Sequence, residues 1–363
     1  MLGRPARIVS ALAAALLLLG QVVAAPAMAA EALKVAFVYF SPVGDTGWTA
    51  EHDKGRKAME ANLGDKVEAK IVENVAFGPD SLQVIRQLAA DGYGLIFTTS
   101  FGFMDQTLEV AELYPDTKFM HLDGYKTAEN MGTYSLRYYE SSYLAGMAAG
   151  AVTKGDTIGY VSSFPLPAVI QIIDAFTLGA QAMKPGVKVK VVEVNSWYDP
   201  GREKEATEAL FSQGIDVVGH VTDSTAPTLA AEAAGKYVVG FHSDRTSYGP
   251  KSQLTAVIPV WGDFYTKVAT SVIDGTWTNK PEWLSMQDGA LAIAPLGAAV
   301  PKEAAEKIAA VEAEIRAGTF SPFQGPIKDQ AGTERVKDGE TLPDEQLYGI
   351  NWYVEGVEGT LPQ

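Results

Sequence analysis

Short apolar runs alternate with longer segments of helical periodicity along the first half of the chain. Four runs rich in Val, Ile and Phe predict buried strands at 35–40, 67–72, 94–99 and 118–122. Helical patterns between them predict helices at 50–62, 79–91 and 104–113, and a shorter apolar–polar segment follows at 132–137. Such alternation is typical of a parallel sheet with helices on both faces. Right-handed crossovers then restrict the topology to a choice of strand order.

The same alternation begins again after a predicted helix at 141–152. Strands are predicted at 157–162, 187–194, 217–220 and 237–241, with helices at 168–183, 202–213 and 226–234. The run 254–258 then leads to a helix at 263–274 that returns to the first lobe, and one more helix is predicted at 302–317. The sequence therefore predicts an α/β fold with two doubly wound parallel-sheet lobes joined by a hinge.

The length of the chain also favours two domains. A chain of 363 residues exceeds one ordinary hydrophobic core. We assign 30–137 and 259–290 to the N-terminal lobe, and 138–258 and 291–330 to the C-terminal lobe. The segment 331–363 has little periodicity, and we expect it to pack on the lobes or the hinge as a C-terminal tail.

The first 29 residues have the features of a secretory signal peptide. Arg4 and Arg7 precede an apolar core at 8–23, and the Ala-Met-Ala at 27–29 fits a cleavage site. The apolar core is short for a membrane span, so an uncleaved anchor is the lesser alternative. The chain has no Cys, which avoids thiol chemistry in an oxidising compartment. We expect a periplasmic protein that is soluble after cleavage.

The charge of the chain excludes some partners. The formal net charge is -15, and the predicted signal peptide contributes only positive charges to it. A strongly acidic chain binds nucleic acid and anionic membranes poorly. We therefore expect neither as a partner.

Polar and aromatic residues gather where the predicted strands end. In an open α/β sheet, ligands bind beyond the carboxyl ends of the strands. The candidates there are Tyr39, Asp45, Trp48, 98–102 and Asp123 in the first lobe, and 195–199, 222–225 and 243–245 in the second. Aromatic rings stack on flat ligands, and carboxylates accept hydrogen bonds from N–H and O–H groups. This combination predicts a cleft site for a planar, N–H-rich heterocycle.

These loops also resemble a known family. The matching stretches are GDTGW at 44–48, FTTSFG at 97–102, YLAG at 143–146, NSWYDPG at 195–201, GFHSD at 240–244, PFQGPI at 322–327 and WYVEGV at 352–357. In order and spacing they resemble the basic membrane protein family of solute receptors for ABC importers, to which purine nucleoside receptors belong. The resemblance implies a type I periplasmic binding protein, a monomer without cofactors, that closes on a small molecule and docks an inner-membrane permease.

The resemblance also implies roles for particular residues. In the purine nucleoside binders of this family, two aromatic residues sandwich the base, and Trp48 and Trp197 fall at these two places. Asp123 matches an Asp that contacts the base edge, and Ser100 lies in the loop that contributes a further polar group. Asp244 matches the second-lobe Asp that binds the ribose hydroxyls.

The chain departs from the family pattern at the places that serve the sugar. Tyr39 or Phe40 stands where the family commonly has Asp, and Pro259 stands where it commonly has Lys. The tripeptide at 47–49 reads Gly-Trp-Thr instead of Ser-Phe-Asn. Because polar groups for the ribose are missing and bulky aromatics shrink the pocket, we expect a free purine base, with adenine first, rather than a nucleoside.

Several candidates also have a purely structural alternative. The two tryptophans could instead pack on their own lobes, and the base-edge Asp could cap the turn that follows it. Asp223 is a further ligand candidate, although the polar run 222–225 before a helix is also ordinary N-cap chemistry. Phe101 either floors the pocket or packs beneath it. Whether Tyr39 faces the ligand depends on the strand register.

Three other functions remain as alternatives: a purine nucleoside receptor, a periplasmic nucleoside hydrolase, and a sensory protein that presents its ligand to a membrane receptor. A hydrolase needs an activated water, hence a metal or a poised general base. The sequence has no G-x-S-x-G elbow, no Cys nucleophile and no phosphate-binding Gly-rich motif. The four histidines, His52, His121, His220 and His242, show no metal-ligand spacing. We therefore expect no enzyme activity, no metal and no cofactor.

Overall fold

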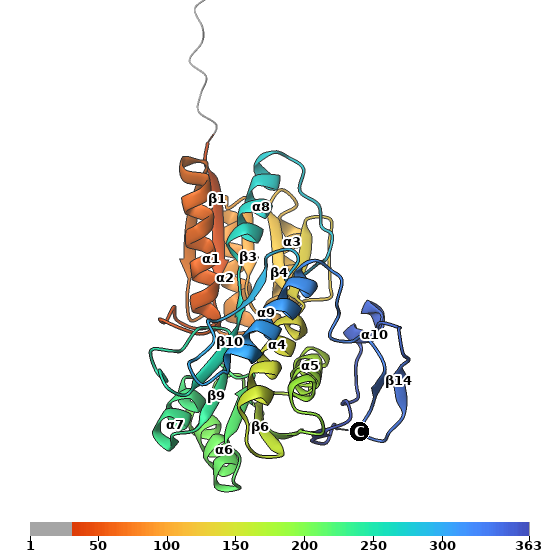
Figure 1. The fold of residues 1–363 in the computed structure, drawn as a ribbon. Coiled ribbons are helices and arrows are strands. Elements are labelled where there is room, and N and C mark those ends of the chain that lie inside the picture. Colours follow the sequence, from red (N-terminus) through yellow and green to blue (C-terminus); the bar gives the residue numbers. More distant parts are fainter. Residues whose placement is uncertain (1–30, 363) are drawn as a thin grey trace, which may run out of the picture. The chain divides into compact units, whose positions relative to one another are not determined.

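Two parallel sheets organise the protein, as Figure 1 shows for the computed structural model, which describes residues 31–362. The first sheet has the strand order β11-β5-β4-β3-β1-β2, and every pairing in it is parallel. Its strands are β1 (Leu33–Val38), β2 (Val67–Val72), β3 (Leu95–Thr98), β4 (Lys118–Leu122), β5 (Met131–Leu136) and β11 (Glu282–Leu284).

The second sheet repeats this topology. Its order is β12-β10-β9-β8-β6-β7-β15, and only the pairing of β10 with β12 is antiparallel. In each sheet the first strand along the chain, β1 or β6, is an inner strand. The second strand, β2 or β7, pairs on one side of it, and the next three strands lie on the other side. Its strands are β6 (Thr157–Ser162), β7 (Lys188–Glu193), β8 (Val217–His220), β9 (Tyr237–Phe241), β10 (Gln253–Pro259), β12 (Leu291–Ile293) and β15 (Val357–Glu358).

Helices flank each sheet, as the alternation predicted. In the first lobe α1 packs against α8, and α2 packs against α3. In the second lobe α4 packs against α5 and α9, and α6 packs against α7. The bounds are α1 (Trp48–Leu63), α2 (Pro79–Ala90), α3 (Met104–Leu113), α4 (Tyr138–Val152), α5 (Pro167–Met183), α6 (Pro200–Ser212), α7 (Ala226–Ala234), α8 (Gly262–Ile273) and α9 (Lys302–Arg316). Two doubly wound lobes are therefore confirmed.

The strands are buried from both sides. All four residues of β3 are buried, and the last four of β1 are buried as well. Phe37 in β1 stacks on Phe97 in β3, with the ring centres 4.7 Å apart. Strands covered on both faces appear in the sequence as continuous apolar runs, which is why the sequence located them well.

Three connections pass between the lobes and form the hinge. Arg137 joins β5 to α4, Val260 and Trp261 join β10 to α8, and the segment 285–290 joins β11 to β12. The strands of the two sheets differ from the expected lobe ranges at two places: β10 extends to Pro259, one residue past the end expected for that part of the second lobe, and β15 comes from the tail. The signal peptide expected at 1–29 lies outside the described residues.

A few elements differ from the expectation. The first strand ends at Val38 rather than Phe40, because the chain turns there into the loop before α1. The segment expected as a short piece at 132–137 is the full strand β5, and the helix expected at 141–152 begins earlier, at Tyr138. The ends of helices and strands depend on caps and tertiary contacts, which the hydrophobic periodicity of the sequence does not show.

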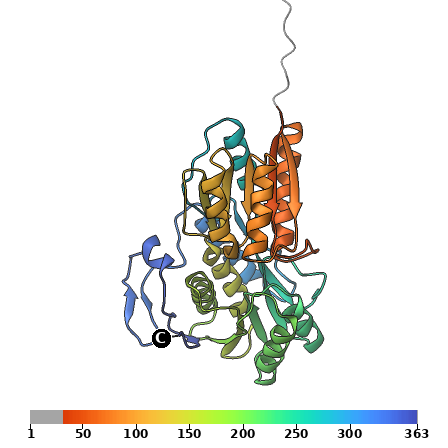
Figure 2. The same cartoon turned by 180° about the vertical axis from the view of Figure 1, so that it is seen from behind.

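The tail is ordered by short elements that carry no readable period. It contains β14 (Glu334–Val336), α10 (Asp344–Tyr348) and β15, which pairs with β7. Strand β14 pairs with β13 (Ile327–Lys328), which lies just before the tail. Figures 1 and 2 show the tail alongside α5. The backbone N–H of Val354 donates to the fully buried Asp174 of α5 at 3.0 Å.

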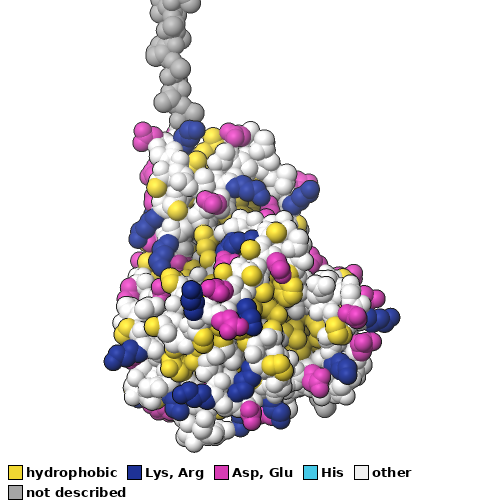
Figure 3. Space-filling model, viewed as in Figure 1, with side chains coloured by type: hydrophobic (Ala, Val, Ile, Leu, Met, Phe, Trp, Pro, Cys, Tyr) yellow, Lys and Arg dark blue, Asp and Glu magenta, His cyan; other side chains and the backbone are white. Residues whose placement is uncertain are grey.

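The surface mixes both signs of charge. On the face in Figure 3, Lys and Arg side chains lie among Asp and Glu side chains, and hydrophobic side chains gather between the second lobe and the tail. Within residues 31–362, no helix combines the length and apolar character needed to cross a bilayer.

Helices α4 and α5 cross in backbone contact through two glycines. A Cβ on Gly146 would lie 2.0 Å from the carbonyl oxygen of Phe176, and one on Gly179 would lie 2.0 Å from that of Tyr143. Because these neighbours are backbone atoms, the helices themselves would have to move apart.

We expect Gly146→Ala to lower the free energy of unfolding by about 2–3 kcal/mol, the upper range for overpacking a tight core. Urea denaturation followed by circular dichroism measures the change. Gly155→Ala is the matched control, because the nearest atom to its Cβ would be 3.8 Å away. Equal stabilities of the two variants would contradict the prediction.

Candidate functional site

The strand-end loops of the two lobes meet where helix α1 begins. The backbone N–H of Trp48 donates to Asp223 of the second lobe, 2.9 Å from Oδ1 and 3.1 Å from Oδ2. The backbone N–H of Gly47 donates to the Ser243 hydroxyl at 2.7 Å. We call these four residues, Gly47, Trp48, Asp223 and Ser243, the interlobe seam.

Trp48 lies half-buried at the seam. Its indole N–H donates to the carbonyl oxygen of Thr99 at 2.7 Å, which ties it to the loop after β3. Its ring meets His52 and His242 edge-on, with ring centres 5.1 and 4.8 Å apart. The indole is therefore held in one orientation by both lobes.

Trp197 lies in the second lobe, and 42% of it is exposed. Its ring packs edge-on against Phe164 at 5.3 Å. Its carbonyl oxygen accepts a hydrogen bond from the backbone N–H of Asp223 at 2.9 Å. Asp223 therefore bonds to the backbone of both candidate clamp residues, Trp197 through its own N–H and Trp48 through its carboxylate.

Asp123 follows β4 and is exposed to solvent. Its backbone N–H donates to the carbonyl oxygen of Tyr134 at 2.8 Å. Although water reaches the carboxyl, protein surrounds it on most sides, and this desolvation raises the pKa of Asp123 to about 7. Because the side chain is exposed, solvent screening opposes this rise.

Ser100 and Phe101 begin the short 3-10 helix η2 (Phe101–Phe103), which follows β3. Ser100 is half-buried, whereas 52% of Phe101 is exposed. The Phe101 ring lies 6.5 Å from that of Tyr125, which is itself exposed. Both rings are thus exposed at the surface of the first lobe.

The carboxylate of Asp244 is partly committed to its own loop. Its Oδ1 accepts hydrogen bonds from Thr246 N–H at 2.9 Å, from the Thr246 hydroxyl at 2.6 Å and from the Gln253 amide at 2.7 Å. Burial alone would raise the pKa of Asp244, but these hydrogen bonds hold it below its usual value. Asp244 is exposed, and the hydrogen bonds of its Oδ1 fix its orientation.

Tyr39 lies in the core of the first lobe. It is fully buried beside Phe37, and within the described residues its hydroxyl has no hydrogen-bond partner. Burial raises the pKa of Tyr39, and the charge of Asp53 raises it further. The structure therefore separates Tyr39 from the exposed candidates Trp197, Asp123 and Asp244.

The backbone is strained at several of these strand ends. Asp123, Asn195 and His242 have φ values of 58°, 51° and 65°, in the left-handed region that side-chain-bearing residues rarely adopt. Each follows a strand end, after β4, β7 and β9. Such strain persists only where the surroundings enforce it, and it concentrates at functional sites.

A buried polar–aromatic cluster lies behind Trp48 and was missed from the sequence. His52 stacks on Trp261 at 4.8 Å, and its Nδ1 lies 2.6 Å from the Tyr265 hydroxyl. Burial holds the pKa of His52 well below its usual value, so this imidazole is neutral. In the described part of the chain, His52 Nε2, Trp261 Nε1 and the Tyr138 hydroxyl have no hydrogen-bond partner. The one sequence signal was the position of His52 four residues after Trp48, on the same helix face.

The described residues contain no cluster of three or more His, Cys, Asp and Glu residues that could hold a metal ion. His121 and His220 are buried within separate lobes, where His121 Nδ1 lies 2.8 Å from the Thr98 hydroxyl and His220 Nδ1 lies 3.1 Å from the Thr222 carbonyl. Both histidines therefore have structural contacts of their own.

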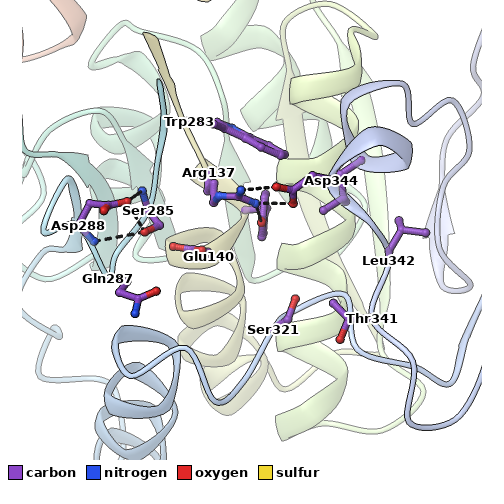
Figure 4. Close-up of a pocket in the computed structure, with 12 residues that line it drawn as sticks. Arg137, Glu140, Trp283, Ser285, Gln287, Asp288, Ser321, Thr341, Leu342 and Asp344 are labelled. Atoms are coloured by element: carbon purple, nitrogen blue, oxygen red, sulfur yellow. Dashed lines mark hydrogen bonds and ion pairs between the residues drawn. The ribbon is translucent and has the colours of Figure 1, made fainter. Parts of the chain in front are cut away.

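A pocket of about 400 Å³ lies at the hinge (Figure 4). Arg137 donates to both carboxylate oxygens of Asp344, at 2.7 and 2.5 Å, and its guanidinium lies 4.0 Å from the ring centre of Trp283. These contacts fasten the tail to the first hinge connection. No local sequence pattern indicates these contacts, because the three residues are distant along the chain.

Glu140 lines the hinge pocket and links two of the connections. Its Oε2 accepts a hydrogen bond from the backbone N–H of Met286 at 2.6 Å. Burial raises the pKa of Glu140 to about 7, and Asp288 adds to the rise, while the Met286 N–H, Arg137 and Arg316 oppose it. The hinge therefore contains a carboxyl group that titrates near neutral pH.

This titration predicts a pH-dependent stability. Between pH 4.5 and about 7 the unfolded chain releases the Glu140 proton while the folded protein retains it. The contribution of Glu140 to the free energy of unfolding therefore falls as the pH rises through this window. We expect the free energy of unfolding of Glu140→Gln, relative to that of the wild type, to rise by about 1–3 kcal/mol from pH 5 to pH 8. Melting temperatures at both pH values measure the gain.

The matched control for this prediction is Glu345→Gln, which neutralises an exposed carboxylate on α10. Its melting temperature should follow that of the wild type at both pH values. If Glu140→Gln also follows the wild type, Glu140 does not titrate in this window.

Comparison with known proteins places this fold and these loops in one family. The Bmp family, described as "ABC transporter substrate-binding protein PnrA-like", matches residues 32–320. A purine-binding protein of Brucella abortus is 46% identical over 337 residues, which cover 93% of this chain and 96% of that protein. A Haloferax volcanii protein, named as an ABC transporter glucose-binding protein, is 38% identical over 333 residues, covering 92% of this chain and 82% of its own.

Solved structures agree on the fold. A solute-binding protein of an ABC transporter from Conexibacter woesei has a TM-score of 0.68 at 20% identity, covering 80% of this chain and 98% of that one. This likeness confirms the type I periplasmic binding fold. The chain belongs to the Bmp family of ABC transporter substrate-binding proteins, extracytoplasmic receptors that bind a small molecule for a membrane permease and are not enzymes.

Proposed function

We propose that the protein binds a free purine base, with adenine the first choice, between Trp48 and Trp197, and delivers it to an inner-membrane ABC permease. The observation that carries this proposal is the pair of hydrogen bonds through Asp223, which joins the loops of both tryptophans at the interlobe seam. One aromatic residue from each lobe then meets the ligand. Stacking of this kind adds about 0.5–1.5 kcal/mol per aromatic pair beyond the burial of area.

The polar groups around these rings fit the edge of a purine. Asp123 is exposed in the loop after β4, and an ionised carboxylate accepts hydrogen bonds from ring or amino N–H groups. Ser100, in the neighbouring loop, both donates and accepts. The purine-binding relative from Brucella abortus, 46% identical, supports this class of ligand.

The environment of Tyr39 supports a base rather than a nucleoside. The family resemblance implies that Tyr39 or Phe40 replaces a carboxylate that serves the sugar, and Tyr39 is an aromatic side chain buried in the core. Asp244 is oriented by three hydrogen bonds to its Oδ1, and we propose that it closes the polar rim of the site. Phe101 would shield the same rim from solvent, and Asp223 would contribute through the seam instead of contacting the ligand.

Sugar binding is the second candidate, because the Haloferax volcanii relative is named as glucose-binding. Isothermal titration calorimetry with adenine, guanine, hypoxanthine, adenosine, inosine and glucose distinguishes these ligands. We expect free bases to bind more tightly than nucleosides, and glucose not to bind. Tight glucose binding without purine binding would overturn the purine proposal, and release of free base from nucleosides would overturn its non-enzymatic nature.

The proposed stacking of the ligand between Trp48 and Trp197 also leads to a prediction for single residues. We expect Trp197→Ala to weaken adenine binding by about 30-fold or more, the usual cost of truncating an aromatic anchor. Tyr198→Ala is the matched control, since its side chain is adjacent and 60% exposed. Its affinity for adenine should stay at the wild-type value. Equal losses in the two variants would show that the loop as a whole, rather than the Trp197 ring, supports binding.

A further inference from the structure

Helix α1 has no cap of its own. The first N–H groups of any α-helix lack partners within the helix. The N-cap residue here is Gly47, which has no side chain to accept from them. The second lobe supplies the acceptors instead, through Ser243 to Gly47 N–H and through Asp223 to Trp48 N–H. These bonds join residues that are 196 and 175 positions apart in the chain.

We propose that Asp223 is a built-in ligand of helix α1: its carboxylate occupies the N-terminus of that helix from the opposite lobe, draws the lobes together, and excludes anionic solutes from the site. The exclusion of anions rests on the proposed function, because it concerns the choice among purine compounds. The attraction between the lobes does not depend on it.

Gly47, the N-cap residue, leaves space for this carboxylate because it has no side chain. Gly47 has a φ of 99°, and a Cβ there would lie 2.9 Å from Asp223 Oδ2 and 3.0 Å from Oδ1. A side chain at this position would therefore displace the carboxylate from the helix end. The first lobe provides both the donor and the space for the acceptor.

The second lobe holds the carboxylate in place from behind. Arg245 is fully buried, and its Nη2 donates to the Asp223 carbonyl at 2.7 Å and lies 3.4 Å from Oδ1. His242 Nδ1 lies 3.1 Å from the same Oδ1. Because these groups belong to the same lobe as Asp223, the carboxylate is oriented before it meets the helix. Such preorganisation reduces the entropic cost of closing.

Two further contacts reinforce the same face of the seam. The Ser243 hydroxyl donates to Glu51 Oε1 at 2.5 Å, in the first turn of α1. The Tyr248 hydroxyl donates to Asp45, in the loop before α1. Protein atoms make both sides of every one of these bonds, so the lobes attract each other without help from a solute.

The exclusion of anions follows from the electrostatics of a helix end. Helix N-termini bind phosphate and carboxylate groups because their N–H groups and dipole favour negative charge. At α1 that place is taken by Asp223, with Glu51 close behind. A second anion there would meet the carboxylates of Asp223 and Glu51, whose two negative charges the single buried guanidinium of Arg245 offsets only in part. The site should therefore accept uncharged heterocycles and reject phosphorylated ones.

The lobe contact is tested by measuring distances between the lobes. The chain has no Cys, so Glu112→Cys on α3 and Glu208→Cys on α6, both exposed, carry spin labels at two defined places. Double electron–electron resonance, without added solute, then reports the distribution of lobe separations. We expect Asp223→Asn to lower the ratio of closed to open molecules about tenfold, the effect of losing one charge-assisted hydrogen bond.

Gly47→Ala tests the same contact from the first lobe and should shift the distribution in the same direction. Its matched control is Gly78→Ala, because Gly78 is the N-cap of α2, has a φ of 89° and has no atom within 4 Å of its Cβ position. Asp199→Asn is the control for the carboxylate, since Asp199 caps α6 within its own lobe at 3.0 Å. Both controls should keep the wild-type distribution, and melting temperatures establish that every variant is folded.

The exclusion of anions is tested with inorganic phosphate and adenosine monophosphate as probes. We expect neither to raise the melting temperature of the wild type, and both to raise that of Asp223→Ala, because the vacated helix end becomes available. Phosphate tests the helix end even if the protein binds no purine. The failure of the purine proposal can therefore be distinguished from the failure of this one. Unchanged lobe distances in Asp223→Asn and Gly47→Ala would overturn the first half of the proposal, and stabilisation of the wild type by phosphate would overturn the second.

Discussion

The N-terminus of helix α1 cannot satisfy its own hydrogen bonds, and much of the site follows from this constraint. Gly47 leaves the first N–H groups of the helix without a side-chain cap, and Asp223 and Ser243 of the second lobe accept from them. Because the backbone N–H of Asp223 also donates to the carbonyl oxygen of Trp197, one residue positions both candidate clamp loops. Local capping, lobe closure and the site geometry thus depend on the same residue.

The sequence predicted the fold well because the strands are buried on both faces and stand out as apolar runs between helical segments. It also identified the strand-end loops, since topology alone determines which loops lie beyond the carboxyl ends. The interpretation of Asp223 shows where local reasoning stops. The polar run 222–225 suggested a cap for the helix that follows it, α7, and the Ser224 hydroxyl does accept from the Ala226 N–H at 3.2 Å. The Asp223 carboxylate, however, accepts from the first turn of α1. No local pattern specifies a partner 175 residues away.

The buried cluster behind Trp48 was beyond sequence reasoning for a related reason. His52, Trp261 and Tyr138 come from α1, a hinge connection and the start of α4, and only the packing of both lobes brings them near the seam. In the hydrophobic pattern of the sequence, such residues look like ordinary core residues, because the pattern does not reveal which of their polar atoms lack partners among the described residues. The hinge pocket has the same origin, since Arg137 and Asp344 pair across 207 positions of the chain.

The tail has a consequence for how the protein is made. Strand β15 pairs with β7, which would otherwise be the edge of the second sheet, through Val357 with Val189 and Glu358 with Lys190. An unpaired edge strand is a template for pairing with other chains. Along the chain, β15 follows every other strand of the second sheet. During synthesis β7 is therefore an open edge of that sheet until the tail has emerged and paired with it.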